Sequence, residues 1–260
     1  GALRRVAGRY QDTMGFTIVG PGRFLGSGHP DLREDLPSSL GLISSDDAGA
    51  SWTPVSLLGE ADLHAIVPAG DRLYAADATA SRLLVSEDDG RTWSTRAAVE
   101  LMALAADPED PARLVGITYD GTAVASNDAG ASFEPVGGAS FTGVVWTTAP
   151  IATDADGRVF EMRGSAWEQI GQLGEVEPTL GTDGQVLVAA LTDGRLRFSD
   201  DGGRTWTGED PQEAKSSGRE ANSSAQSVEQ NHHCSPSTSS RVPAGGRTRM
   251  RHTGSTCAPV

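Results

Sequence analysis

Short runs of alternating apolar and polar residues, separated by turn residues, follow one another along the first four fifths of the chain. One such unit predicts strands at 61–67, 72–76, 82–86 and 93–96. Strands in the same order are predicted at 17–19, 24–27, 40–44, 52–56, 102–106, 114–118, 123–126, 143–147, 158–162, 179–181, 186–190 and 196–199. No segment has a helical period, so the pattern predicts an all-β fold.

A turn motif of the form S-x-D-x-G-x-[S/T]-aromatic recurs between the third and fourth predicted strands. Complete copies stand at 45–52, 86–93, 126–133 and 199–206, and a worn copy at 160–167 keeps only its Gly and Trp. The closing aromatic residues are 41, 40, 34 and 39 residues apart. This is the period of one four-stranded propeller blade, so we predict a β-propeller with about five visible units.

Each residue type in the motif has a physical reason. The Asp carboxylate can accept N–H groups of its own turn, and Gly supplies a positive φ. The aromatic side chain can pack between neighbouring sheets. The predicted structural residues are Ser45, Asp47, Gly49, Trp52, Ser86, Asp88, Gly90, Trp93, Ser126, Asp128, Gly130, Phe133, Ser199, Asp201, Gly203 and Trp206.

Composition changes near residue 208. Residues 209–260 contain no Trp, Phe, Tyr, Ile or Leu, so they cannot bury enough apolar surface to offset their chain entropy. We therefore predict a propeller domain at 1–208 and a disordered tail at 209–260. Two interpretations of the tail remain open: a frameshifted terminus, or a genuine flexible linker or anchor segment.

Charge narrows the partner classes. Of 21 basic and 35 acidic residues, 6 and 5 lie in residues 209–260, which leaves 15 basic against 30 acidic residues in the predicted propeller. A net charge of −15 (15 minus 30) disfavours nucleic acid and anionic membranes. No apolar stretch is long enough for a membrane span.

The four complete motifs resemble the Asp-box (BNR) repeats of sialidases, of the sortilin luminal domain and of photosystem II assembly-factor-like propellers. The segments 11–16 and 24–33 more particularly resemble actinobacterial envelope proteins described as sialidase-like glycosyl hydrolases. This resemblance implies a secreted or cell-envelope location. The sequence itself also predicts an opening strand at 2–6, and this strand together with the five visible units predicts a six-bladed parent. The resemblance also implies an opening unit before Gly1 and a last outer strand after Trp206, both of which we expect to be missing here.

Two polar loops are predicted to lie on the propeller face opposite the repeated turns. They span 27–36 and 57–64, and they belong to adjacent blades. The candidate ligand-binding residues are His29, Asp31, Arg33, His64 and Asp77, with His29 and His64 also candidates for a divalent metal. Asp31, Glu34 and Asp35 are the candidate catalytic carboxylates of a hydrolase. Thr79, Arg82, Tyr119 and Asp120 are weaker candidates on the same face.

A structural interpretation competes with the functional one. In it, residues 29–31 form a turn, Arg33 pairs with Glu34 or Asp35, and His64 donates a hydrogen bond to a carbonyl under the loop.

The catalytic set implied by the sialidase resemblance is not found. The chain lacks a Phe-Arg-Ile-Pro-like motif, and none of Tyr10, Tyr74 and Tyr119 has an evident Glu partner. We therefore favour a monomeric binding or assembly module, without a required cofactor, for an unknown protein or glycan. A sialidase-like glycoside hydrolase is the alternative, and an inactive fragment with open sheet edges is a third hypothesis.

Overall fold

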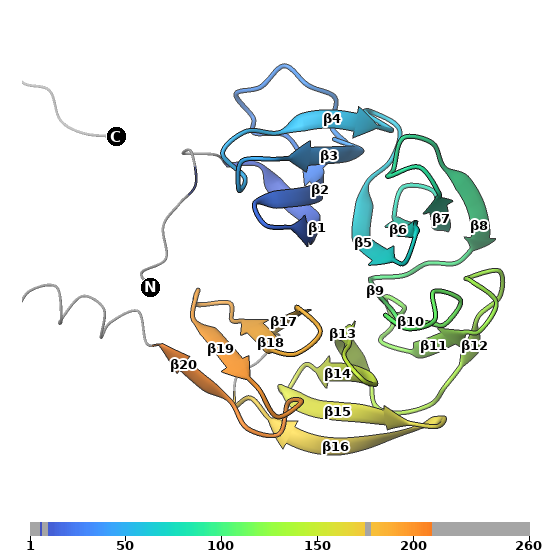
Figure 1. The fold of residues 1–260 in the computed structure, drawn as a ribbon, viewed down its shortest axis with the longest axis vertical. Helices are drawn as coiled ribbons and strands as arrows, with labels where there is room; N and C mark the ends of the chain where they lie inside the picture. The colour runs from blue at the N-terminus through green and yellow to red at the C-terminus, as the bar shows by residue number, and fades with distance from the viewer. Residues whose placement is uncertain (1–5, 7–9, 175–177, 210–260) are drawn as a thin grey trace, which may run out of the picture. The chain divides into compact units, whose positions relative to one another are not determined.

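The computed structural model describes residues 6, 10–174 and 178–209, and these form five four-stranded antiparallel sheets (Figure 1). Blade 1 contains β1 (Asp12–Gly20), β2 (Arg23–His29), β3 (Leu42–Ser45) and β4 (Thr53–Ser56). Blade 2 contains β5 (Leu63–Ala69), β6 (Arg72–Asp77), β7 (Arg82–Ser86) and β8 (Ser94–Ala98). Blade 3 contains β9 (Ala103–Ala106), β10 (Leu114–Ile117), β11 (Ala123–Ser126) and β12 (Glu134–Pro135). Blade 4 contains β13 (Phe141–Trp146), β14 (Pro150–Asp154), β15 (Arg158–Arg163) and β16 (Ala166–Gln172). Blade 5 contains β17 (Thr179–Thr182), β18 (Leu187–Ala190), β19 (Leu196–Ser199) and β20 (Thr207–Glu209).

Each blade is a meander, because strands that follow one another in the chain are neighbours in the sheet. The first strands of successive blades pack together in the order β1, β5, β9, β13 and β17. The described residues contain no helix. The predicted all-β propeller is therefore confirmed, with five blades in the described part of the chain.

Four apolar clusters fill the interfaces between consecutive blades. Between blades 1 and 2, Leu42 and Leu63 are fully buried, and Tyr74 and Leu114 are buried between blades 2 and 3. The closing aromatic of the later blade contributes to each cluster: Trp93, Phe133, Trp167 and Trp206. In blades 2 to 5 the aromatic residue of the motif therefore packs into the interface with the preceding blade.

The four repeated turns have the same hydrogen-bonded hairpin structure, here named the Ser–Asp–Gly hairpin. Its copies are residues 45–52, 86–93, 126–133 and 199–206. At the second copy, Ser86 Oγ donates to Asp88 Oδ1 at 2.8 Å and accepts from Gly90 N at 2.9 Å. Asp88 also accepts from Thr92 N at 2.8 Å and from Thr92 Oγ1 at 2.7 Å. Because one carboxylate satisfies several turn donors, the hairpin needs little help from the rest of the sheet.

The glycine of this hairpin leaves room for a leucine side chain of the preceding blade, and this glycine–leucine contact is named here the interlock. Gly90 has a φ of 80°, and a Cβ there would lie 2.2 Å from Leu42 Cδ2 of blade 1. At Gly130 the corresponding atom is Leu83 Cδ2, at 2.3 Å. Only glycine provides both the left-handed backbone and the space for the neighbouring leucine.

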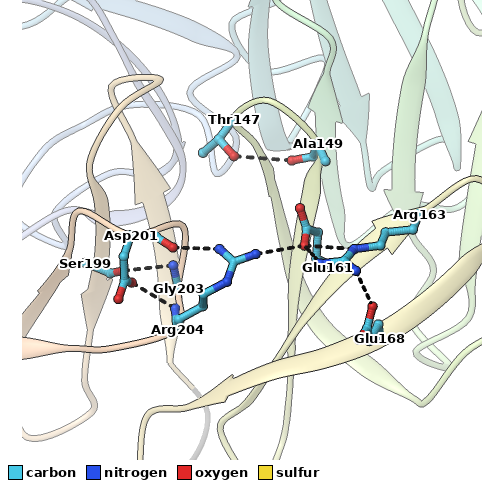
Figure 2. A network of polar contacts seen from close by, with 9 residues as sticks. All are labelled: Thr147, Ala149, Glu161, Arg163, Glu168, Ser199, Asp201, Gly203 and Arg204. Atoms are coloured by element: carbon cyan, nitrogen blue, oxygen red, sulfur yellow. Dashed lines mark hydrogen bonds and ion pairs between the residues drawn. The ribbon is translucent and has the colours of Figure 1, made fainter.

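Polar contacts reinforce the same interfaces. Ser56 Oγ of blade 1 donates to Gly90 O at 2.6 Å, and Arg96 of blade 2 donates to Asp128 O at 2.9 Å and Ala129 O at 3.0 Å. In blade 5, Arg204 reaches back to Glu161 Oε2 of blade 4 at 3.2 Å (Figure 2). The hairpin is thus a connector between blades as well as a turn within one.

The worn copy in blade 4 keeps the paired strands of the hairpin but lacks the serine and aspartate side chains that form the motif's hydrogen bonds. β15 and β16 are joined through Gly164, which has a φ of 65°. Trp206 Nε1 donates to Gly203 O at 3.0 Å, whereas the buried Trp167 Nε1 has no partner among the described residues. A two-residue turn with a positive-φ glycine is therefore enough to complete the sheet.

Two predictions about the ends of the propeller need correction. The strand predicted at 17–19 is longer than expected, because β1 starts at Asp12, includes most of residues 11–16 and pairs with β2. The last outer strand, predicted to be missing, is present, because β20 pairs with β19 through Thr207, Gly208 and Glu209. Most of the opening strand predicted at 2–6 lies outside the described residues.

One face of blade 1 remains exposed. The side chains of Met14, Phe16 and Ile18 are exposed on β1, while Gly15 of the same strand approaches Leu63 of blade 2. The alternation shows that β1 packs on blade 2 through one face only.

Gly90→Ala tests the interlock between Gly90 and Leu42, with Gly49→Ala as the matched control. Gly49 has a φ of 83°, but a Cβ there would meet nothing nearer than 3.7 Å. We expect Gly49→Ala to cost about 1 kcal/mol from the left-handed backbone alone. Gly90→Ala should cost about 1–3 kcal/mol more because of overpacking against Leu42. Urea unfolding followed by Trp fluorescence measures both, and equal losses would contradict the interlock.

Stability should also fall at low pH through the hairpin carboxylates. Hydrogen bonds from Thr92 and Ser86 lower the pKa of Asp88 to about 2, and bonds from Ser51 and Ser45 lower that of Asp47 to about 2. Since the unfolded pKa is about 3.9, this stabilisation is complete above about pH 5 and is lost as the pH falls through about 2.

Urea unfolding at several pH values between 5 and 2.5 tests this assignment. Asp88→Asn should lower the free energy of unfolding at pH 5 and make its decline below pH 4 shallower. Asp89→Asn, at an exposed neighbouring carboxylate, is the control and should leave the slope unchanged. An unchanged slope in Asp88→Asn would show that the acid dependence arises elsewhere.

Candidate functional site

Four polar side chains from three blades meet on the face opposite the Ser–Asp–Gly hairpins. Asp62 Oδ2 lies 3.0 Å from His64 Nε2 and 3.6 Å from His29 Nε2. Tyr119 Oη, from the loop after β10, lies 2.7 Å from His64 Nδ1. The structure thus brings together the two predicted histidines, His29 of blade 1 and His64 of blade 2. With them lie Tyr119, a weaker candidate of the sequence, and Asp62 from the predicted polar loop 57–64.

A β-bulge places His64 in this cluster. Leu63 pairs with Asp77 and Ala65 with Ala76, so His64 is an extra residue in β5. A bulge bends the strand locally and redirects a side chain. A hydrogen bond from Leu63 N to Ser27 Oγ of blade 1, at 3.0 Å, fixes the strand at this point.

The partner atoms define where the protons lie. Asp62 Oδ2 accepts from His64 Nε2, which leaves Nδ1 of the neutral ring to accept from the Tyr119 hydroxyl. His29 Nδ1 lies 2.7 Å from the Ser38 carbonyl, which can only accept, so this nitrogen carries the hydrogen. In a neutral ring, His29 Nε2 therefore presents a lone pair towards Asp62.

Tyr119 is a hydrogen-bond donor in this arrangement. Its pKa is raised, first by burial and then by the negative charges of Glu100 and Asp62. The phenol consequently keeps its proton at neutral pH and is a poor nucleophile.

A second repeat, which we did not predict, organises the loops of this face. Each blade has an aspartate at or just after the end of its second strand: Asp31, Asp77, Asp120, Asp154 and Asp193. Four of them pair with an arginine: Asp31 with Arg33, Asp77 with Arg82, Asp154 with Arg158, and Asp193 with Arg195. Asp120 instead accepts from Thr118 Oγ1 and Thr122 N.

This repeat gives several candidate residues a structural contact. Arg33 was expected to pair with Glu34 or Asp35, but it pairs with Asp31, through both side-chain and backbone nitrogens. These hydrogen bonds lower the pKa of Asp31 to about 2. Asp31 is therefore ionised and held by Arg33 at neutral pH. This contact disfavours the proposed acid–base role of Asp31.

The other candidate residues take no part in the contacts that join His29, Asp62, His64 and Tyr119. Asp77 binds Arg82 Nε at 2.8 Å and Thr79 N at 3.0 Å, so these three residues fasten one turn. Glu34 and Asp35 are exposed, and Glu34 N closes a turn on Asp31 O at 2.8 Å. The expectation that His64 donates to a carbonyl is wrong, because its nitrogens contact Asp62 and Tyr119.

A metal at His29 and His64 stays a prediction. Both rings face Asp62, but within the described ranges no group of three or more His, Cys, Asp or Glu side chains is placed to hold an ion. The same residues include no helix with the length and apolar character of a membrane span.

The comparisons with known proteins identify the fold. A family model described as the DUF6242 beta propeller domain matches residues 37–138. No curated protein matches the chain.

Several solved structures are similar. In "Crystal structure of Nidogen/Laminin Complex", the matched chain is 12% identical, with a TM-score of 0.57, covering 73% of this chain and 76% of that one. For "YCF48 bound to D1 peptide" the values are 14%, 0.51, 78% and 70%. For the GH74 xyloglucanase from Xanthomonas campestris they are 17%, 0.52, 75% and 32%, so this chain spans about a third of that enzyme. At these identities the likeness shows the fold alone.

The Asp77–Arg82 pair should contribute strongly to stability, because the Asp77 side chain is fully buried. Arg82→Met leaves that carboxylate without its ionic partner and should cost about 3 kcal/mol. The matched control is Arg195→Met in blade 5, where the paired Asp193 side chain is half exposed and little change is expected. Denaturant unfolding of both variants decides the matter; equal, small losses would contradict a fastening role for the buried pair.

Proposed function

We propose that this chain is a binding module that holds a polypeptide segment on the face opposite the Ser–Asp–Gly hairpins, named here the loop face. The segment would bind around His29, Asp62, His64 and Tyr119. The observation that carries this proposal is the convergence of side chains from three blades at one place. The polar contacts that reinforce the blade interfaces each join two blades, whereas this cluster joins three. A site shared by several blades is a common arrangement for ligand binding in repeat folds.

Exposed apolar side chains around this cluster support a polypeptide ligand. Leu32, Leu36 and Leu58 are exposed in the two loops that flank His29 and Asp62. These loops are joined by a hydrogen bond from Gly59 N to Ser39 O at 2.8 Å. Apolar anchors beside polar groups are typical of peptide recognition. A propeller of similar fold, YCF48, is described as bound to a D1 peptide.

A glycoside hydrolase is the second candidate, favoured by the carboxylates on this face and by the fold of the xyloglucanase. The contacts of Asp31 with Arg33 disfavour it, and so does the raised pKa of Tyr119. We interpret the hairpins as Asp boxes, and we propose an envelope or secreted location on the sequence resemblance alone.

Selection of random dodecapeptides on immobilised protein tests the proposal. The selected peptides should bind the soluble chain, and Leu32→Asp should weaken them at least about tenfold by removing an anchor and its apolar area. Ile18→Asp is the matched control, since it makes the same change at an exposed site on β1 and should leave affinity unchanged. Fluorescence anisotropy measures both affinities.

Two outcomes would contradict the binding module. One is peptides that lose affinity on Ile18→Asp but not on Leu32→Asp, which would place binding elsewhere. The other is turnover of a fluorogenic glycoside panel, sialosides included, that Asp31→Ala abolishes, which would establish the hydrolase.

A further inference from the structure

Four arginines of the loop face form ion pairs with carboxylates of the same face. Arg33, Arg82 and Arg158 each bind the aspartate of their own loop, and Arg195 binds Asp193. By contrast, the side chains of Asp35, Glu60 and Glu100 make no ion pair with any described residue. The positive charges of this face are therefore neutralised by neighbouring carboxylates, whereas some of its negative charges are not. A ligand at this face meets a net negative charge.

Asp62 places a buried negative charge within the cluster of His29, His64 and Tyr119. The residue is only 9% exposed, and its Oδ1 is buried without a hydrogen-bond partner among the described residues. Its other oxygen faces two histidines, which carry charge only when protonated. A buried carboxylate with no permanent cation beside it attracts one from outside.

The neighbouring groups are arranged as acceptors. The Ser38 carbonyl holds the hydrogen of His29 on Nδ1, so Nε2 of the neutral ring and Asp62 Oδ2 are two acceptors 3.6 Å apart with no donor between them. His29 has a side chain that is 43% exposed, so this pair can be reached from solvent. A single nitrogen carrying several hydrogens could donate to both acceptors.

Tyr119 adds an aromatic wall. It is 47% exposed and its hydroxyl hydrogen is used by His64, so the ring face and an oxygen lone pair are what it offers a ligand. An aromatic face attracts cations, and more strongly where a negative charge lies nearby.

We propose that this cluster binds a primary ammonium group, in particular a lysine side chain of the polypeptide ligand. The inference rests on the proposed function and specifies the ligand chemistry of that same site. Ammonium is compact and carries three donors, which suits two close acceptors beside an aromatic ring. The lysine stem would lie along Tyr119, and the exposed leucines would contact the flanking residues of the ligand.

Amine probes test this chemistry without a known ligand. Nα-acetyl-lysine methylamide should shift the NMR signals of the His29 and His64 rings and of Tyr119, while the uncharged isostere Nα-acetyl-norleucine methylamide should not. Asp62→Asn and Tyr119→Leu should each weaken the lysine probe about tenfold or more. Asp89→Asn removes the same charge from the opposite face and should leave affinity unchanged.

The peptides from the selection give a second, separable readout. Replacing their lysines by norleucine should weaken binding to the native chain at least about tenfold and should have little effect on the Asp62→Asn variant. Tyr119 is exposed, so its variant keeps the test valid if Asp62→Asn does not fold.

The two proposals can fail separately. If the two probes bind alike, or if neither variant weakens the lysine probe, the ammonium site is overturned even where peptides still bind the loop face. If no peptide binds the loop face, the proposed function fails, whatever the lysine probe does.

Discussion

The structure depends on the contact between an apolar side chain of one blade and the hairpin glycine of the next. A propeller blade is a small sheet with little core of its own, so it depends on packing against a neighbouring blade for its stability. The Ser–Asp–Gly hairpin provides a rigid seat, because its aspartate and serine satisfy the turn internally. The glycine then leaves space for Leu42 in one interface and Leu83 in the next.

This interlock explains how distant residues form one site. His64 and Tyr119 are 55 residues apart, yet their contact is 2.7 Å long. Its geometry is set by the packing of blades 2 and 3 and by the aspartates that fasten the loops. Asp31 and Asp77 pair with arginines in those loops, and Asp62 is left without such a partner. The chemistry available to a ligand follows from that difference.

The repeat could be predicted because its physics is local. The hydrogen bonds made by the serine and aspartate side chains of a Ser–Asp–Gly hairpin all form within eight residues, so the sequence contains this part of the interaction. The pairing of β20 was missed because a three-residue edge strand carries almost no pattern. The bulge at His64 and the approach of Tyr119 depend on the packing of two blades, which no local pattern encodes.

Part of the site had a readable signal. In four blades an aspartate at or just after the end of the second strand is followed two to five residues later by an arginine: Asp31, Asp77, Asp154 and Asp193. Comparing the units for this second repeat would have assigned Arg33 to Asp31. It would also have separated these aspartates from Asp62, which precedes a first strand and has no counterpart arginine.

Native-state hydrogen exchange tests the interlock most directly. The amides of Gly90 and Gly130, which donate to Ser86 and Ser126, lie in hairpins that a neighbouring leucine covers. The account predicts that they exchange only through the same opening as the central strands β6 and β10. Exchange of both glycines at the much faster rate of Gly164 in the uncovered hairpin of blade 4 would contradict it.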